Sequence, residues 1–291
     1  MRILILGASG YLGSRLFVIL QKYGNVSGTF NSNGFVSENM AYWDGDSNLL
    51  LHILAKLEPE LVINCSGFAE VDQSEMNPEK AFYLNAIVPH YISSACQELN
   101  IKYVHISTDH YIGGKTLLLE EEMPVTCPNI YSASKLLGEN YVLAANSSSI
   151  VVRANFFHFS KNNSDKFLDR CLNQPNNAAE IHGFQDIFYT PISTIYLASA
   201  IMTLVNQEFK GLIHIASSER ISKYIFLKEI FRHMNKNQAV IKPRNWIDGQ
   251  LKATRPEDMS LSNRMYRSLV NESIPTISKM IKTELEFAGI I

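Results

Sequence analysis

Three glycines at the spacing GxxGxxG constrain the fold of this chain more than any other sequence feature. Gly7, Gly10 and Gly13 stand between an apolar strand pattern at 2–6 and a helical pattern at 14–23. In a strand–loop–helix unit, the first glycine permits a tight turn, the second lets a pyrophosphate approach the backbone, and the third lets the helix pack on the strand. The loop therefore predicts a dinucleotide-binding domain, and the alternative is a glycine-rich turn without a ligand.

Strand and helix patterns alternate through the first half of the sequence. The expected strands are 26–30, 61–65, 102–108 and 150–153, and the expected helices are 49–57, 78–99 with a break or kink at Pro89, and 131–145. Strands that are apolar on both faces and alternate with helices indicate a parallel sheet. We therefore expect an α/β fold with a doubly wound parallel sheet of the Rossmann type.

The second half of the sequence is less regular. It predicts helices at 165–173, 193–205, 223–234 and 277–287 and a strand at 212–216. We expect a dinucleotide-binding domain over residues 1–155 and a smaller substrate-binding domain over residues 156–291. Residues from roughly 190 to 217 are expected to return to the first domain, because their strand can rejoin the parallel sheet.

Composition excludes several classes of function. The 26 basic and 28 acidic residues give a net charge of −2, and no run of Lys or Arg occurs, so we expect neither a nucleic-acid nor a membrane partner. No apolar stretch could span a bilayer, and the run 3–6 is too short for a signal peptide, which predicts a cytoplasmic protein. The four cysteines show neither CxxC spacing nor a His cluster, which favours reduced thiols and no metal site.

A tyrosine and a lysine four residues apart mark the candidate catalytic centre. Tyr131 and Lys135 share one face of an expected helix, where the lysine charge can lower the pKa of the phenol. Such a pair is common by chance and would alone indicate packing. The preceding strand, however, ends in Ser107-Thr108-Asp109, which brings a hydroxyl group to the same region. We therefore expect Thr108, Tyr131 and Lys135 to act together.

The residues after the second expected strand bear on the coenzyme. An acidic residue there would bind the ribose hydroxyls of NAD and repel the 2′-phosphate of NADP. The segment from Thr29 to Ser32 holds no acid, which favours NADP over NAD, but it also holds no arginine that would bind the 2′-phosphate. Asn31 is a candidate contact. Asp44 follows Tyr42-Trp43, where a third strand is expected to end. It is either a contact to the adenine end of the cofactor or a solvated turn acid.

Several segments together resemble one family of enzymes. The glycine spacing and YxxxK resemble the extended branch of the short-chain dehydrogenases/reductases. Within that branch, the dTDP-4-dehydrorhamnose reductases are similar in five further places: Asn64 to Glu75, Asn77-Pro78 with Asn85, Ser107-Thr108-Asp109, Gly138-Glu139, and Arg255-Pro256 with Asp258, Ser260 and Leu261. Arg153-Ala154-Asn155-Phe156 stands where the family has R-T-x-W. The similarity covers nearly the whole chain.

The resemblance implies a role for each matching position. The cofactor would be bound by the glycine loop, by the end of the fourth strand and by the expected coenzyme contacts: Gly7, Ser9, Gly10, Tyr11, Leu12, Gly13, Asn31, Asp44, Asn64, Cys65 and Ser66. Thr108 would hydrogen-bond the reacting sugar oxygen, Tyr131 would protonate it, and Lys135 would bind the nicotinamide ribose. The substrate would contact Val71, Asp109, His110, Asn155, Phe156 and Arg255, with the arginine at its diphosphate.

The departures from the family pattern lie around the substrate. His110 replaces a tyrosine, Tyr111 to Gly113 replaces V-F-D, Ser132 replaces a glycine, and Phe156 replaces a tryptophan. The exact sugar is therefore left open. His110 is either a sugar contact, a second proton donor or a loop histidine with a local hydrogen bond, and His105 is expected to be a packed core residue.

The resemblance implies an NADPH- or NADH-dependent reductase of a nucleotide-linked 4-keto-6-deoxy sugar, active in surface polysaccharide biosynthesis. One alternative is an epimerase or dehydratase of the same superfamily that retains NAD. Another is a non-catalytic regulatory subunit that resembles the β-subunit of methionine adenosyltransferase. The expected partner is a nucleotide sugar, and the sequence leaves the oligomeric state open, a homodimer included.

Overall fold

Seven parallel strands form one sheet in the order β13-β8-β5-β4-β1-β2-β3. The computed structural model describes residues 1–31, 37–113, 118–160, 168, 180–246, 252–270 and 273–291. The strands of the sheet are β1 (Arg2–Leu6), β2 (Asn25–Phe30), β3 (Met40–Tyr42), β4 (Leu61–Asn64), β5 (Lys102–Ile106), β8 (Ile150–Arg153) and β13 (Gly211–His214). The chain leaves β1 toward β2 and later returns to β4 on the other side of β1, so the strand order reverses between β1 and β4. The predicted doubly wound parallel sheet is confirmed.

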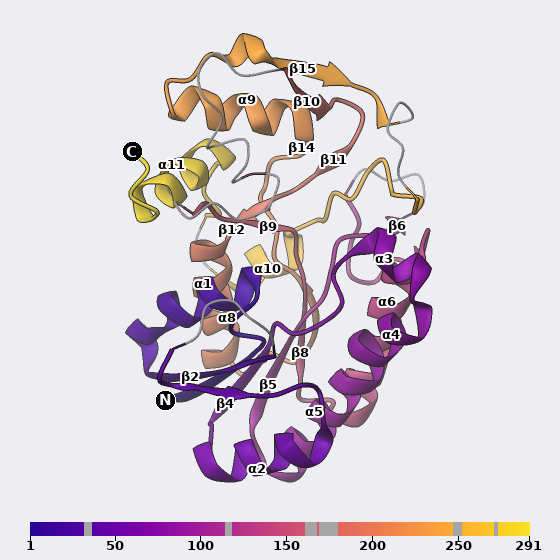
Figure 1. The fold of residues 1–291 in the computed structure, drawn as a ribbon, viewed down its shortest axis with the longest axis vertical. Coiled ribbons are helices and arrows are strands. Elements are labelled where there is room, and N and C mark those ends of the chain that lie inside the picture. The colour runs from indigo at the N-terminus through magenta and orange to yellow at the C-terminus, as the bar shows by residue number, and fades with distance from the viewer. Residues whose placement is uncertain (32–36, 114–117, 161–167, 169–179, 247–251, 271–272) are drawn as a thin grey trace.

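Alternating side chains cover the two faces of the sheet. Ile3 and Ile5 of β1 pack in one apolar cluster, and Leu4 and Leu6 pack in another, because successive side chains of a strand point to opposite faces. Helices α1 (Tyr11–Ile19) and α8 (Thr194–Asn206) cover the first face. Helices α2 (Ser47–Leu57), α5 (Val88–Glu98) and α6 (Ile130–Ala145) cover the second (Figure 1).

Local sequence signals explain where the helices begin and end. The Asp46 side chain accepts a hydrogen bond from the Leu49 amide and caps α2. The expected helix at 78–99 is interrupted before Pro89. It consists of α4 (Pro78–Phe82), a π-helical turn (Tyr83–Ile87) and α5. Pro89 lies in the first turn of α5, where a missing amide hydrogen costs least, so the predicted break is confirmed.

The second half of the chain contributes to the large sheet and to smaller ones. Strand β13 pairs with β8, and α8 lies against α1.

The remaining described elements come from both halves of the chain. They are α3 (Val71–Met76), β6 (Ile112–Gly113), β7 (Val125–Thr126), β9 (Phe156–Phe157), β10 (Ile181–Phe184), β11 (Phe188–Tyr189), β12 (Ile192–Ser193), β14 (Ile221–Ser222), α9 (Lys223–His233), β15 (Ile241–Arg244), α10 (Arg264–Leu269), α11 (Ile277–Phe287), and 3₁₀ turns at Leu20–Tyr23 and Gln238–Val240. Apart from Leu168, the expected helix at 165–173 lies outside the described residues. The proposed domain boundaries stay a prediction.

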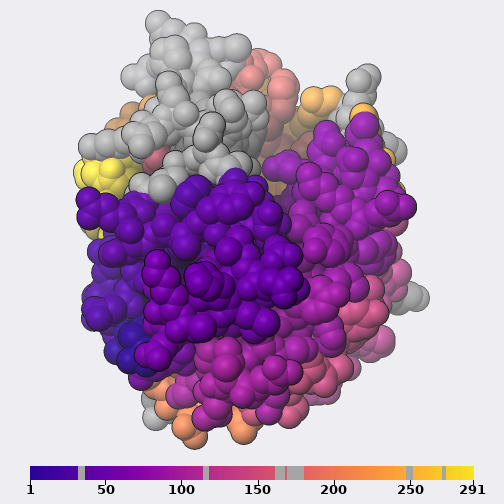
Figure 2. Space-filling model, turned by 60° about the horizontal axis from the view of Figure 1, so that its bottom comes forward, coloured from indigo at the N-terminus to yellow at the C-terminus, as the bar shows by residue number. Residues whose placement is uncertain are grey.

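The C-terminal elements gather at one end of the molecule. Figure 1 shows α9, β10 and β15 together beyond the sheet, with α2 near the opposite end. Seen from below, the front face is formed mainly by N-terminal residues, and orange and yellow C-terminal residues lie at its margins (Figure 2). Among the described residues, no helix is both long and apolar enough to cross a membrane.

Gly138 shows how tightly α6 packs against the π-helical turn. A Cβ at this position would lie 2.0 Å from the carbonyl oxygen of Asn85 in the π-helical turn. In an open helix, Gly→Ala stabilises by about 0.5–1 kcal/mol, but here we expect Gly138→Ala to lower the free energy of unfolding by about 1–3 kcal/mol. Urea denaturation measures the change, and Asn140→Ala, on the exposed side of the same helix, serves as the control. A stabilised Gly138→Ala protein would contradict the observed packing.

Candidate active site

A cleft of about 400 Å³ lies at the carboxyl edge of the sheet. It is lined by residues from the ends of β1, β4, β5 and β8 and from the start of α6. The sequence-predicted residues that line it are Gly10, Tyr11, Leu12, Cys65, Ser66, Val71, Thr108, Asp109, His110, Tyr131, Lys135, Asn155 and Phe156. The structure therefore brings together most of the predicted cofactor, catalytic and substrate residues. Their roles stay predictions.

A second hollow of about 380 Å³ lies at the amino edge of the sheet. Its walls come from the start of β5 and β8 and from the turn between α8 and β13, including Lys102, Ile150 and Lys210. None of the residues singled out from the sequence lines it. In parallel α/β sheets, ligands bind outside the carboxyl ends of the strands, which favours the first cleft as the active site.

The glycine loop has the geometry that its spacing predicts. Gly7 adopts a φ of +77°, and its amide donates to Thr29 Oγ1 at 3.0 Å. A Cβ at Gly13 would lie 2.2 Å from the Gly7 carbonyl oxygen, so α1 meets the loop at a distance that only glycine allows. No side chain caps α1, and Gly10 at its N-cap position is exposed in the cleft. The helix end is thus accessible to an anion.

Tyr11 joins the glycine loop to the far wall of the cleft. Its hydroxyl donates to the carbonyl oxygen of His158 at 3.1 Å, and its ring stacks on the imidazole of His158 with centroids 4.0 Å apart. Phe156 lies beyond, with ring centroids 6.3 Å from Tyr11. Sequence reasoning missed His158, because a histidine in an apolar F-x-F run gives no signal of its own.

The end of β4 shapes the floor of the cleft. Asn64 is fully buried and does not line the cleft. Its Oδ1 accepts hydrogen bonds from the amide and hydroxyl of Ser66 at 3.0 and 2.6 Å. Cys65 lines the cleft, and burial raises the pKa of its thiol to about 12, so it is a neutral thiol. Asn64 therefore supports Ser66 from below, whereas the sequence predicted a direct cofactor contact.

Thr108 and Tyr131 present hydroxyl groups to the same cleft. Thr108 Oγ1 accepts a hydrogen bond from the His110 amide at 3.2 Å, so the hydroxyl can use its own proton as a donor toward the Tyr131 side. Burial raises the pKa of Tyr131 to about 12, although a hydrogen bond with the Thr108 side chain opposes the rise and Asp109 adds to it. The Tyr131 phenol is therefore protonated at neutral pH.

Lys135 lies deeper in the cleft than Tyr131 and points toward β5. Its Nζ donates to the Ile106 carbonyl oxygen at 2.7 Å and is 3.4 Å from Nε2 of His105. Burial lowers the pKa of Lys135 to about 8, while Glu139 and Cys65 raise it. The expected lowering of the Tyr131 pKa by Lys135 is not found, because burial dominates at Tyr131 and the ammonium group is bound to the β5 backbone. His105 is fully buried, as the sequence predicted.

Asp109 and His110, on the substrate side, have pKa values that burial shifts away from their usual values. Burial raises the pKa of Asp109 to about 6, and Asn155 Nδ2 donates to its Oδ2 at 2.7 Å. Burial lowers the pKa of His110 to about 3, helped by Lys223 and Arg255, so the imidazole is neutral. Its ring meets Tyr131 edge-on with centroids 5.5 Å apart, and its buried Nδ1 has no hydrogen-bond partner among the residues that the structure describes. His110 can therefore exchange a hydrogen bond with a ligand.

Besides Asn64, the predicted residues that do not line the cleft are Gly7, Ser9, Gly13, Asn31, Asp44 and Arg255. Asp44 is exposed and accepts a hydrogen bond from the Asp46 amide at 3.1 Å, which matches the alternative of a solvated turn acid. Asn31 is exposed at the end of β2. Arg255 NH2 lies 3.3 Å from Asp72 Oδ1 of α3, and within the described part of the chain its buried NH1 has no hydrogen-bond partner.

Lys223 was not predicted as a site residue. It begins α9. Burial lowers its pKa, the charge of Asp109 opposes this lowering, and the charge of Arg255 adds to it. Its charge therefore acts on the substrate side of the cleft. A lone lysine at the start of a helix carries no sequence signal that could have identified it. Among the described residues, no group of three or more His, Cys, Asp or Glu side chains could hold a metal ion.

Comparison with known proteins identifies the family. Residues 1–287 match the family described as the RmlD substrate binding domain. The chain belongs to this family. The spore coat polysaccharide biosynthesis protein SpsK of Bacillus subtilis is 27% identical over 264 residues, which are 90% of this chain and 89% of that protein. The dTDP-4-dehydrorhamnose reductase of Mycobacterium tuberculosis H37Rv is 25% identical over 91% of this chain and 86% of that protein.

Solved structures of similar proteins agree with this assignment. A dTDP-4-dehydrorhamnose reductase of Clostridium acetobutylicum has a TM-score of 0.83 at 25% identity and covers 99% of this chain and 100% of its own. A UDP-glucose 4-epimerase of Thermus thermophilus in complex with NAD has a TM-score of 0.81 at 17% identity, with both chains fully covered, which shows a shared fold alone. The predicted membership of the dTDP-4-dehydrorhamnose reductase-like family is confirmed.

Two glycines of the loop predict separable effects on folding and on cofactor binding. A side chain at Gly10 would meet only the Gly7 carbonyl oxygen, at 3.2 Å, and its φ of −78° suits any residue. We expect Gly10→Val to fold but to bind NADPH at least about tenfold more weakly, a loss of about 1.4 kcal/mol, because its side chain occupies the approach to the backbone. Gly13→Val should instead destabilise the fold.

Fluorescence titration with NADPH and urea denaturation distinguish the two effects. Val18→Ala, at an exposed position of α1, is the control for both measurements. Normal NADPH binding by Gly10→Val would show that the loop does not receive the pyrophosphate.

Proposed function

We propose that this protein reduces the keto group of a nucleotide-linked 4-keto-6-deoxy sugar with NADPH. The observation that carries the proposal is the convergence of Thr108, Tyr131 and Lys135 on the cleft into which the glycine loop opens. The relatives named dTDP-4-dehydrorhamnose reductase and the spore coat polysaccharide protein support a nucleotide-sugar reductase. The product would serve surface polysaccharide biosynthesis.

The residues present fit a nicotinamide dinucleotide. The uncapped start of α1 and the exposed Gly10 would receive the pyrophosphate, and Ser66, held by Asn64, would line the path toward the reaction centre. Lys135 would bind the nicotinamide ribose. When bound, the reduced cofactor supplies the hydride, which is chemistry that no side chain offers.

The two hydroxyl groups handle the substrate oxygen. Thr108 can turn its hydroxyl proton from the Tyr131 phenol to the substrate, and Tyr131 is protonated, so both can hydrogen-bond the carbonyl oxygen. As negative charge develops on that oxygen, Tyr131 transfers its proton. Lys135 would stabilise the phenolate that remains once its ammonium group turns from the Ile106 carbonyl oxygen toward the phenol. A phenol with a raised pKa holds its proton until the alkoxide forms, and the alkoxide is the stronger base.

The substrate side favours a ligand with both polar and anionic groups. Asp109 with Asn155 and the neutral His110 can exchange hydrogen bonds with sugar hydroxyls. Arg255 and Lys223 supply positive charge for a diphosphate. The proposal of NADPH over NADH rests on the missing acid after β2, and equal or better catalytic efficiency with NADH would contradict it.

A panel of nucleotide-linked keto sugars tests the proposed function. NADPH oxidation is followed by its absorbance, with thymidine- and uridine-linked 4-keto-6-deoxy sugars as substrates. Turnover that consumes one NADPH per sugar supports the reductase. A purified protein that carries NAD and converts nucleotide sugars without added cofactor would instead be an epimerase or dehydratase. Cofactor binding without turnover would favour the regulatory subunit.

Tyr131→Phe tests the proton donor. The change keeps the ring packed against His110 and removes only the hydroxyl, so kcat should fall by about 10²–10⁴-fold while the NADPH affinity stays close to wild type. Lys135→Met should weaken both, because its ammonium group would contact the ribose as well as the phenol. Circular dichroism checks the fold. Reduction of the keto sugar by Tyr131→Phe at the wild-type rate would disprove the mechanism.

A further inference from the structure

Glu139 joins the catalytic helix to the end of β5. It lies on α6 one turn beyond Lys135 and two turns beyond Tyr131, so the three residues share one side of the helix. Its carboxylate accepts a hydrogen bond from the hydroxyl of Ser107 and another, at 2.8 Å, from the phenol of Tyr111. Ser107 precedes Thr108, and Tyr111 follows His110. One carboxylate thus holds both flanks of the segment that carries Thr108, Asp109 and His110.

Arg153 completes the anchorage from the neighbouring strand. At the end of β8, its NH2 donates to Glu139 Oε2 at 2.6 Å, and its Nε lies 3.0 and 3.1 Å from the two carboxylate oxygens. The guanidinium also lies 4.6 Å from the centroid of the Tyr111 ring. Two residues later, Asn155 holds Asp109. The Glu139–Arg153 pair, with the hydrogen bonds of Glu139 to Ser107 and Tyr111, therefore fixes α6, β5 and β8 relative to one another.

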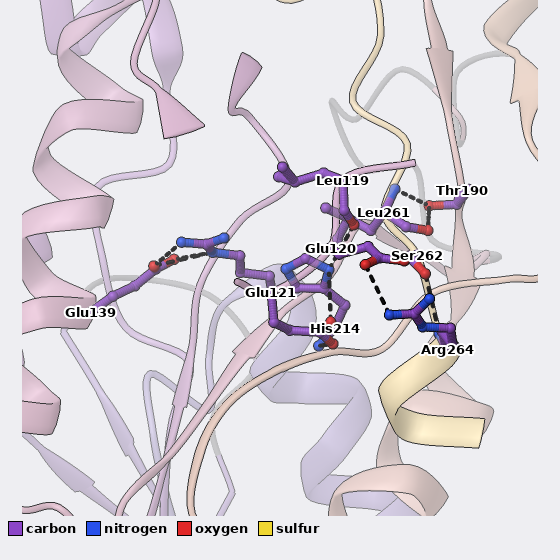
Figure 3. A network of polar contacts seen from close by, with 10 residues as sticks. Leu119, Glu120, Glu121, Glu139, Thr190, His214, Leu261, Ser262 and Arg264 are labelled. Carbon is purple, nitrogen blue, oxygen red and sulfur yellow. Dashed lines mark hydrogen bonds and ion pairs between the residues drawn. The ribbon is translucent and has the colours of Figure 1, made fainter. Parts of the chain in front are cut away.

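The network extends away from the cleft into the segment after β6. Figure 3 shows Glu139 at one side and Glu121 and His214 further along. Glu121 Oε1 accepts a hydrogen bond from the His214 amide at 2.8 Å. Burial raises the pKa of Glu121, and the charge of Arg153 is among the effects that oppose this rise. Both side chains of the Glu139–Arg153 pair are almost fully buried, at 3% and 4% exposed. Desolvation offsets much of the attraction in such a pair, so its contribution to stability does not by itself explain its presence.

Glu139 also places a negative charge beside Lys135. The other groups around the ammonium are His105 from β5, Cys65 after β4 and Tyr131 on α6 itself. His105 is neutral because burial holds its pKa well below the usual value, and Cys65 is a neutral thiol. Burial lowers the pKa of Lys135, and Glu139 is the group that opposes this lowering most strongly. The charge balance of Lys135 therefore depends mainly on Glu139.

We propose that Glu139 is a positioning residue that ties the Thr108 segment to the catalytic helix and keeps Lys135 in its ammonium form. The inference rests on the proposed function in one respect, since it takes Lys135 to be a residue of the active site. On this proposal, the buried Glu139–Arg153 pair serves the chemistry of the cleft as well as the fold.

Competitive labelling of Lys135 tests the proposal without any substrate. The protein is acetylated with acetic anhydride across the pH range in which lysines titrate, and mass spectrometry of the Lys135 peptide gives the fraction labelled. Without the Glu139 charge the pKa of Lys135 should fall, because burial then acts with less opposition. We expect Glu139→Gln to move the midpoint of labelling down by about 1 pH unit. At pH values below both midpoints, Lys135 would then be acetylated ~10-fold faster than in the wild type, because more of it is free amine.

Three further variants separate this effect from a loss of structure. Glu139→Gln leaves Arg153 buried without its partner, so Glu139→Gln/Arg153→Met, which removes both charges, is made in parallel and should show the same lowered midpoint. Glu139→Asp retains the charge and should restore a midpoint close to wild type. Glu284→Gln is the matched control, because Glu284 is fully buried and paired with Arg15 at 2.8 Å on the other face of the sheet. It should leave the midpoint unchanged.

Turnover gives the second readout. For the reductase reaction, protonated Lys135 is needed, so activity is present below its pKa and is lost as the pH rises through it. Glu139→Gln should therefore shift the alkaline limb of kcat to lower pH by the same amount as the labelling midpoint, and Glu139→Asp should shift it back. A wild-type labelling midpoint in both Glu139→Gln and the double variant would overturn the proposal. Lowered midpoints in a protein that reduces no keto sugar would overturn only the proposed function.

Discussion

All seven strands of the sheet run in one direction, and the position of every functional group depends on this constraint. Parallel strands place their carboxyl ends at one edge, so the loops after β1, β4, β5 and β8 meet there although their sequences are far apart. The reversal of strand order between β1 and β4 opens the cleft between Gly10 and Ser66. Helix α6 then crosses behind β5 and adds Tyr131 and Lys135. The amino edge of the same sheet, with a hollow of similar size, receives none of these residues.

Burial sets the chemistry of the groups that this edge collects. It raises the pKa of Tyr131 and Asp109 and lowers the pKa of Lys135 and His110, so each group moves toward its neutral form. For Tyr131 the shift retains the proton that a reduction consumes. For Lys135 it weakens the charge that a phenolate needs, and Glu139 counteracts that loss. In the proposed mechanism, Tyr131 needs its neutral form and Lys135 needs its charged form within one low-dielectric site. Lys135 has the carboxylate of Glu139 one turn along α6, and this carboxylate favours the charged form.

The sequence predicted the features that backbone geometry dictates. The glycine loop, the parallel sheet, the break at Pro89 and α11 follow from steric rules and hydrophobic periodicity, and the structure has them. The roles of Asn64 and Lys135 were harder to predict. Whether a side chain at a strand end points into the cleft or beneath it depends on partners such as Tyr103 and Ser66, which only the folded chain brings together. Lys223 and His158 gave no signal, because their neighbours in the site are distant in sequence.

The two ends of the cleft obey different constraints, which explains where this chain departs from the family pattern. At the cofactor end, the backbone forms the site. Gly13 cannot accept a Cβ, and Gly7 has a φ that disfavours one, so the sequence has little freedom. At the substrate end, the walls are side chains, and His110 or Phe156 can replace another residue without moving the backbone that supports Thr108. That backbone is held separately, by the hydrogen bonds of Ser107 and Tyr111 to Glu139. In the proposed function, His110 and Phe156 can therefore vary with the sugar, whereas Tyr111, itself a departure from the family pattern, belongs to the support of Thr108.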